Sequence, residues 1–219
     1  MMHLMYHDIK EQISNIESDY DIHIEDFKKH VDLTSSLENA PIFTFDDGKK
    51  GCYEASKVLD KHNMKGIFFI ITSLIDKNGY LSARQILDMC SRGHQIGSHS
   101  HTHPLFKWLD NDKVEHEIFR SKKILEGITG ENINQFAFPG GKYRKVQISI
   151  VKNLGLDKIY DSFEKIPKHT TNAVIHRFHV RQSTSKYFDC IINKRRSYLA
   201  KRFIRSLLSE WSDIMRQLK

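Results

Sequence analysis

The sequence predicts an α/β fold, a shortened and distorted (β/α) barrel of about seven parallel strands. Short apolar segments typical of strands alternate with amphipathic helical segments, and the connections between them are short. This alternation extends over about 185 residues, whereas a complete eight-unit barrel typically takes about 250. In such folds the functional groups follow the C-terminal ends of the strands. We therefore expect the residues of a functional site directly after the strands.

The expected strands are short and rich in apolar residues. The segment Gly66–Ile71 is apolar throughout, as in a strand that is buried on both faces. The strands are expected at His3–Tyr6, Pro41–Phe45, Gly66–Ile71, Gln95–Ser98, Gln135–Phe138, Ile159–Phe163 and Val174–Val180.

The expected helices lie between these strands and have apolar residues at helical spacing. Ser82 and Gln85 have the spacing of a capping box, and Gly93 supplies the C-terminal stop of the same helix. Helices are expected over Glu25–Ser36, Lys50–His62, Ile86–Ser91, Lys113–Ile128 and Val146–Leu154.

The composition is that of a folded globular chain, with 219 residues of which 39% are hydrophobic and 28% charged. No apolar run approaches the roughly 20 residues that span a bilayer, and the charged first 20 residues lack the apolar core of a signal peptide. The three cysteines have no CxxC spacing, which argues against a disulfide framework or a zinc ribbon. We therefore expect one main domain over residues 1–185 in a cytoplasmic protein.

The net charge of +7 is concentrated at the C-terminus. Residues 186–219 contain nine Lys or Arg and three Asp or Glu, which accounts for six of the seven net charges. We expect a basic amphipathic helical tail there, with Ile204, Leu207, Trp211, Ile214 and Leu218 along one face. The tail could pack on the barrel, or residues 198–219 could contact anionic lipid at the inner membrane face. Nucleic-acid binding is not expected, because no aromatic platform or nucleic-acid motif accompanies the charge.

Polar residues follow two of the expected strands. Asp46, Asp47 and Gly48 come directly after one apolar strand. Because successive side chains of an extended backbone point to opposite faces, the two carboxylates are expected to have different roles, such as metal ligand and proton acceptor. A solvated turn is the alternative interpretation of this short segment.

Another expected strand is followed by three histidines at every second position, His99, His101 and His103. Pro104 comes directly after the last of them. Neutral imidazole is the commonest transition-metal ligand. Two imidazoles and one carboxylate leave coordination positions open, as in catalytic rather than structural sites. Together the two segments predict a metal site.

These segments resemble the motifs of the polysaccharide deacetylases, carbohydrate esterase family 4. The resemblance rests on TFDDG at residues 44–48, HSHTH at residues 99–103 and FAFPGG at residues 136–141, in the family's order and spacing. It extends from about Leu4 to Val180. It implies that residues 1–185 are a deacetylase-like catalytic domain with a distorted barrel.

The resemblance also implies a role for each matching residue. Asp47, His99 and His103 match the family's metal ligands, and Asp46 matches the catalytic base. The backbone N–H of Gly140 matches the donor that holds the oxyanion. His101 fills a variable position of the motif. The cofactor is then a divalent ion, with Zn²⁺ favoured and Co²⁺, Ni²⁺ or Mn²⁺ compatible with the same ligands.

The sequence departs from the family pattern at two points. An arginine that usually orients the base is replaced by Ala137, and Arg177 is a candidate substitute, although a surface arginine is the plainer interpretation. The motif of the acid histidine is absent from the C-terminal third and occurs instead at Leu4–His7. This resembles the circularly permuted branch that includes the biofilm poly-N-acetylglucosamine deacetylases, with His7 as the acid. A protonated His7 near a cation would need a carboxylate partner, and the alternative is an exposed histidine.

The resemblance implies hydrolysis of an N-acetyl group on an amino sugar of a glycan or glycan precursor, which could be lipid-linked. A deformylase or another amide hydrolase of the same family is the second expectation. A catalytically retired domain that binds a glycan or a protein partner is the third. The intact set of Asp46, Asp47, His99 and His103 argues against retirement.

Overall fold

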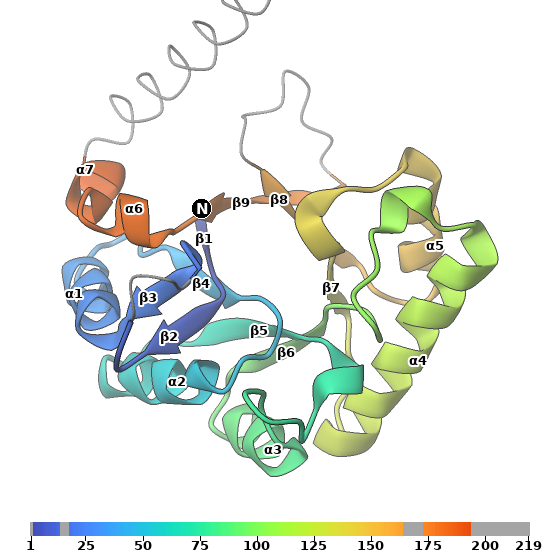
Figure 1. Ribbon diagram of the computed structural model, residues 1–219, viewed down its shortest axis with the longest axis horizontal. Coiled ribbons are helices and arrows are strands. Elements are labelled where there is room, and N and C mark those ends of the chain that lie inside the picture. The colour runs from blue at the N-terminus through green and yellow to red at the C-terminus, as the bar shows by residue number, and fades with distance from the viewer. Residues whose placement is uncertain (1, 14–17, 164–172, 194–219) are drawn as a thin grey trace, which may run out of the picture.

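Seven parallel strands form a closed barrel in this computed structural model, which describes residues 2–13, 18–163 and 173–193 (Figure 1). The predicted shortened barrel is therefore confirmed. Its strands, in order around the ring, are β1 (His3–Tyr6), β4 (Ile42–Phe45), β5 (Gly66–Ile70), β6 (Gln95–Ser98), β7 (Gln135–Ala137), β8 (Lys158–Phe163) and β9 (Ile175–His179).

The first strand closes the ring. β1 pairs in parallel with β4, where Tyr6 lies opposite Phe45, and with β9, where Met5 lies opposite His179. The N-terminal and C-terminal parts of the barrel thus meet at β1, and the residue after β1 lies beside the ends of β4 and β9.

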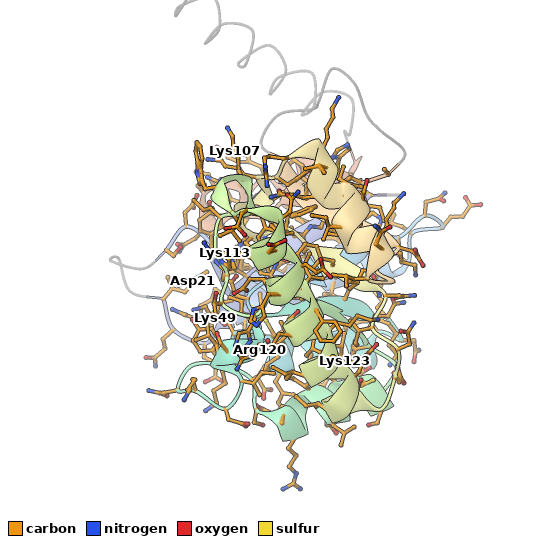
Figure 2. All side chains as sticks on the ribbon, turned by 90° about the vertical axis from the view of Figure 1, so that its right-hand side faces the viewer. Asp21, Lys49, Lys107, Lys113, Arg120 and Lys123 are labelled. Carbon is orange, nitrogen blue, oxygen red and sulfur yellow. The ribbon has the colours of Figure 1, made fainter. Side chains whose placement is uncertain are left out.

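The main helices of the described residues lie around the outside of the barrel, against most of its strands (Figure 1). The predicted capping box is present, because the Ser82 side chain and Gln85 bond each other's backbone. The helices are α1 (Ile24–Ser35), α2 (Gly51–Lys61), α3 (Ala83–Ser91), α4 (Asn111–Thr129) and α5 (Lys145–Asn153). Lys113, Arg120 and Lys123 project from the outer side of α4 (Figure 2). No helix in the described ranges is both long enough and apolar enough to cross a bilayer.

Several short elements were not predicted. A small two-stranded sheet joins β2 (Asp8–Lys10) and β3 (Asp21–His23), which are too short to show a hydrophobic period. Within the described ranges, 3-10 turns also connect other elements: η1 (Thr72–Leu74), η2 (Phe106–Trp108) and η3 (Pro139–Gly141).

The chain continues after the barrel into α6 (Gln182–Ser185) and α7 (Phe188–Asn193). Phe188 is buried and its ring stacks on His30 of α1, with the ring centroids 3.8 Å apart. The predicted basic helical tail covers residues 186–219; α7 lies in its first part, and the rest of the tail, residues 194–219, lies outside the described residues.

The main core lies between the outer faces of the strands and the helices. It combines aliphatic and aromatic side chains, and Phe45 stacks on Phe68 at 4.6 Å between centroids. Inside the barrel, Phe69 and Tyr160 pack beside the guanidinium of Arg177, which lies 5.0 Å above the Phe69 ring. A buried charge in this interior requires an ion-pair partner.

Candidate active site

The predicted site residues gather at the C-terminal end of the barrel. Asp46 and Asp47 follow β4, His99 follows β6, and His7 follows β1. Arg177 differs from these because it lies within β9 and its side chain is completely buried. Parallel strands thus bring together groups that are far apart in the sequence, as expected for a barrel.

Asp46 and Arg177 form a buried ion pair. The guanidinium donates to both carboxylate oxygens, at 2.5 Å to Oδ1 and 2.8 Å to Oδ2, and its Nε donates to the carbonyl of Asp161. Burial acts to raise the pKa of Asp46, but the guanidinium of Arg177 holds that pKa well below its ordinary value. Asp46 is therefore ionised and fixed in orientation. Arg177 lies where the missing family arginine was expected to act, in contact with the candidate base.

Asp47 has a left-handed backbone, with φ at 71°. The alternation assumed for an extended backbone does not hold at this residue, so the two adjacent carboxylates approach the same imidazole. Nε2 of His99 lies 3.6 Å from Oδ1 of Asp47 and 3.8 Å from Oδ2 of Asp46. The two carboxylates differ in environment instead, since Asp46 is buried against Arg177 and Asp47 is partly exposed.

The orientation of His99 is fixed by the main chain. Its Nδ1 lies 2.8 Å from the carbonyl oxygen of Ala137, so Nδ1 carries the proton and donates it. The lone pair of Nε2 then faces the carboxylates. Burial lowers the pKa of His99, which favours the neutral imidazole that can bind a metal ion.

Asp47, His99 and His103 form a set of potential metal ligands. Oδ1 of Asp47 lies 3.6 Å from Nε2 of His99 and 3.6 Å from Nε2 of His103, and all three atoms lie within 4.8 Å of one another. These separations suit three ligands of one cation, each at about 2.0–2.2 Å from it. The donor set and the fixed tautomer of His99 therefore fit a divalent metal ion. The side chain of His103 is 36% exposed and that of His99 only 2%, so the set opens to solvent on the His103 side.

His101 lies outside this set. Its Nδ1 is 2.9 Å from the hydroxyl of Thr72, on the 3-10 turn after β5. Gly140 lies beyond β7 in the turn η3, after Phe138 and Pro139, and has a left-handed backbone with φ at 60°. A side chain there would meet Leu105 at 3.2 Å, so the third motif packs against the segment that follows His103.

His7 occupies a mostly buried position beside the candidate site. Burial lowers the pKa of His7, whereas the charges of Asp46 and Asp47 act in the opposite direction. The expected hydrogen-bonding carboxylate is absent at Nδ1, which is buried and has no hydrogen-bond partner among the described residues. The neighbours of the ring are instead Tyr20, at 4.6 Å between centroids, and His179, at 5.9 Å.

His179 and Tyr20 were not predicted as parts of this environment. Burial lowers the pKa of His179 to about 3, so its imidazole is neutral. A signal for His179 was present, because it follows Arg177 by two residues in a strand and therefore shares its barrel-facing side. Tyr20 gave no such signal, since it lies in a connecting segment.

The fold and the site define a (β/α)-barrel protein with a carboxylate–imidazole centre at the C-terminal ends of its strands. The sequence model of the family described as polysaccharide deacetylase matches residues 37–159, which is more than half of the chain. The chain belongs to this family.

The chain is also similar in sequence to known deacetylases. The chain is 28% identical over 131 residues to a peptidoglycan-N-acetylglucosamine deacetylase of Bacillus cereus, and the match covers 59% of each protein. The chain thus spans about three-fifths of the length of that relative.

Solved structures share the fold. The Streptococcus pyogenes deacetylase PplD in complex with acetate matches with a TM-score of 0.76 and 19% identity, over 84% of this chain and 93% of that one. IcaB from Ammonifex degensii matches with a TM-score of 0.70 and 20% identity, over the same shares of the two chains.

Proposed function

We propose that this protein is a metal-dependent hydrolase that removes the N-acetyl group from an amino sugar in a glycan or glycan precursor. The observation that carries the proposal is the convergence of Asp47, His99 and His103 beside the buried Asp46–Arg177 pair. Membership of the polysaccharide deacetylase family supports the reaction class, and the relative from Bacillus cereus supports an N-acetylglucosamine substrate.

Asp47, His99 and His103 would hold the divalent ion, with Zn²⁺ favoured and Co²⁺, Ni²⁺ or Mn²⁺ compatible. When bound, such an ion supplies Lewis-acid polarisation of the amide carbonyl and of a water molecule. The partly exposed His103 side leaves room for the substrate, and the buried His99 side fixes the ligand geometry.

Asp46 accepts a proton from the attacking water as the water oxygen bonds to the amide carbon. Its carboxylate is suited to this role because Arg177 fixes both of its oxygens and keeps it ionised. Each carboxylate oxygen has a second lone-pair site, so the pair with Arg177 leaves acceptor capacity.

Gly140 and His7 complete the reaction in this proposal. The N–H of Gly140 donates a hydrogen bond to the oxyanion, an interaction whose loss typically costs about 10²–10³ in rate. Protonated His7 then donates its proton to the amide nitrogen, the C–N bond breaks, and the products are acetate and a free amine. Asp46 and Asp47 favour the charged form of His7 against the effect of its burial.

The test is release of acetate from N-acetylglucosamine oligomers by the Zn²⁺-loaded protein. Asp47→Ala and His103→Ala should lose bound metal, measured by elemental analysis, and with it the activity. Asp46→Asn should keep the metal and lose about 10²–10⁴ in kcat, because the proton acceptor is gone. His101→Ala is the matched control, since His101 lies in the same loop but bonds Thr72.

Full metal content in Asp47→Ala and His103→Ala would contradict the assigned ligands. If the protein releases formate from an N-formyl substrate but no acetate from the matched N-acetyl substrate, its activity is that of a deformylase and not of a deacetylase. A metal-loaded protein that hydrolyses neither substrate but binds the oligomers would be a glycan-binding domain.

A further inference from the structure

The loop that carries His99 and His103 has an unusual backbone. Two of its non-glycine residues, Ser100 and His103, have left-handed conformations with φ at 68° and 62°. Residues with a Cβ adopt this region only where the surroundings hold them there. One of the two is itself a candidate metal ligand, so whatever holds the loop also sets the position of that ligand.

Glu117 of α4 holds the centre of this loop. Its Oε2 accepts the backbone N–H of His101 at 2.9 Å and that of Thr102 at 2.7 Å, while its Oε1 accepts the hydroxyl of Thr102 at 2.7 Å. Two successive backbone N–H groups therefore converge on one carboxylate oxygen, which is the geometry of a backbone anion nest. Hydrogen bonds to a charged acceptor are about twice as strong as neutral ones.

Other hydrogen bonds also fix this loop. The N–H of His103 donates to Oγ of Ser100 at 2.9 Å, and the carbonyl of His101 accepts the N–H of Ser73 at 2.9 Å. These bonds run within the loop and to η1. Glu117 supplies a link from this loop to α4, on which Lys113, Arg120 and Lys123 are exposed (Figure 2).

We propose that Glu117 is a positioning residue for the metal site. By binding the backbone of residues 101 and 102, its carboxylate keeps the loop in the one conformation in which the imidazoles of His99 and His103 both face Asp47. The inference rests on the proposed metal dependence of the protein. Groups that orient metal ligands in this way typically contribute about 10–100-fold to metal affinity.

The test is the Zn²⁺ affinity of the purified protein, measured by competition with a chromophoric chelator. Glu117→Ala removes all three bonds and should weaken Zn²⁺ binding by about 10–100-fold. Glu117→Gln retains one carbonyl oxygen that can accept both backbone N–H groups, so its affinity should lie within a few-fold of the wild type. Glu115→Ala, an exposed carboxylate two residues earlier on α4, is the matched control and should change nothing.

Thermal unfolding of the metal-free proteins separates positioning from simple stabilisation. If Glu117 only stabilised the fold, Glu117→Ala would lower the unfolding temperature and leave the Zn²⁺ affinity unchanged, which would overturn the inference. It would also be overturned if Glu117→Gln lost as much Zn²⁺ affinity as Glu117→Ala while remaining folded.

If Glu117→Ala does not fold, Glu117→Asp replaces it. Its side chain is one methylene too short to reach all three donors, so it should also weaken Zn²⁺ binding. A wild-type protein that binds no Zn²⁺ or other divalent ion would refute this inference and the proposed metal dependence together.

Discussion

Arg177 reaches Asp46 across the inside of the barrel, between residues 131 positions apart in the sequence. Both side chains are almost completely shielded from solvent. A buried carboxylate without its counter-ion would take up a proton or destabilise the folded protein, and either change alters the ionised carboxylate of the candidate site. The charge of Asp46 therefore depends on a residue from the last strand of the barrel.

Arg177→Ala should destabilise the fold by about 3–5 kcal/mol, because it leaves the Asp46 charge buried and unpaired. Urea denaturation measures this change, and acetate release should fall in parallel. Arg144→Ala is the matched control, since Arg144 is an exposed arginine with hydrogen bonds to Leu109 and Asn111, and it should cost about 1 kcal/mol or less. A loss of less than 1 kcal/mol for Arg177→Ala would contradict the importance of the pair.

The residue types of the site could be predicted from the sequence, but their orientations could not. Adjacent aspartates predicted two roles, yet the left-handed backbone of Asp47 depends on the turn after β4 and has no local signal beyond the following glycine. The partner of His7 was expected to be a carboxylate, and the structure places His179 and Tyr20 against the ring instead. These contacts join distant segments, which a linear pattern does not reveal.

At the scale of elements, α1 is attached to the barrel and to the C-terminal helices through His30. Its Nδ1 lies 3.1 Å from the hydroxyl of Tyr6 in β1, and its Nε2 lies 3.1 Å from the hydroxyl of Ser185 in α6. The ring also stacks on Phe188 of α7. One neutral imidazole thus joins four elements, and its protonation would disturb all of them.

Stability should fall on acidification because of His30. Burial lowers the pKa of His30 to about 4 from its ordinary 6.5, so between these values the unfolded chain binds a proton that the folded protein does not. The free energy of unfolding should decrease by up to about 3 kcal/mol as the pH falls from 6.5 to 4. His3 and His179, whose pKa values are lowered to about 4 and about 3 by burial, add to the same trend.

His30→Phe isolates this contribution. The variant should show a smaller decrease between pH 6.5 and 4, measured by urea denaturation at each pH. At pH 8 every histidine of the unfolded chain is neutral. The difference in free energy of unfolding between the variant and the wild type at that pH therefore measures the lost hydrogen bonds without any effect of protonation. An identical slope for both proteins would exclude His30 as a source of the acid sensitivity.

The main helices and strands could be predicted closely because each carries its own local signal. The helix that begins after Ser82 has a capping box, and β5 is an uninterrupted apolar run. The short β2 and β3 have three residues each and become a sheet only by lying beside each other. Elements of that length depend on tertiary contacts rather than on a period in the sequence.

For the molecule as a whole, the number of strands followed from the alternation along the chain, but the closure of the ring did not. The chain begins its first strand at His3 and returns to it with β9, so β1 has a neighbour on each side. Its central side chains, Leu4, Met5 and Tyr6, are all completely buried. The strand that ends just before His7 is therefore also the strand that closes the barrel.

Deletion of residues 1–7 should abolish cooperative folding. Burial of Leu4 and Met5 alone contributes about 1.5–3 kcal/mol for each side chain, and Tyr6 adds to this, against a total stability of about 5–15 kcal/mol for a typical domain. The deletion would also leave β4 and β9 as unpaired edges that can associate with other chains.

His7→Ala is the matched variant, since it removes the candidate acid and leaves the strand intact. It should melt close to the wild type, with a rate of acetate release about 10²–10⁴ lower. Thermal melts followed by circular dichroism, with size-exclusion chromatography, distinguish the two variants. A truncated protein that elutes like the wild type and melts within a few degrees of it would show that β1 is dispensable for closure.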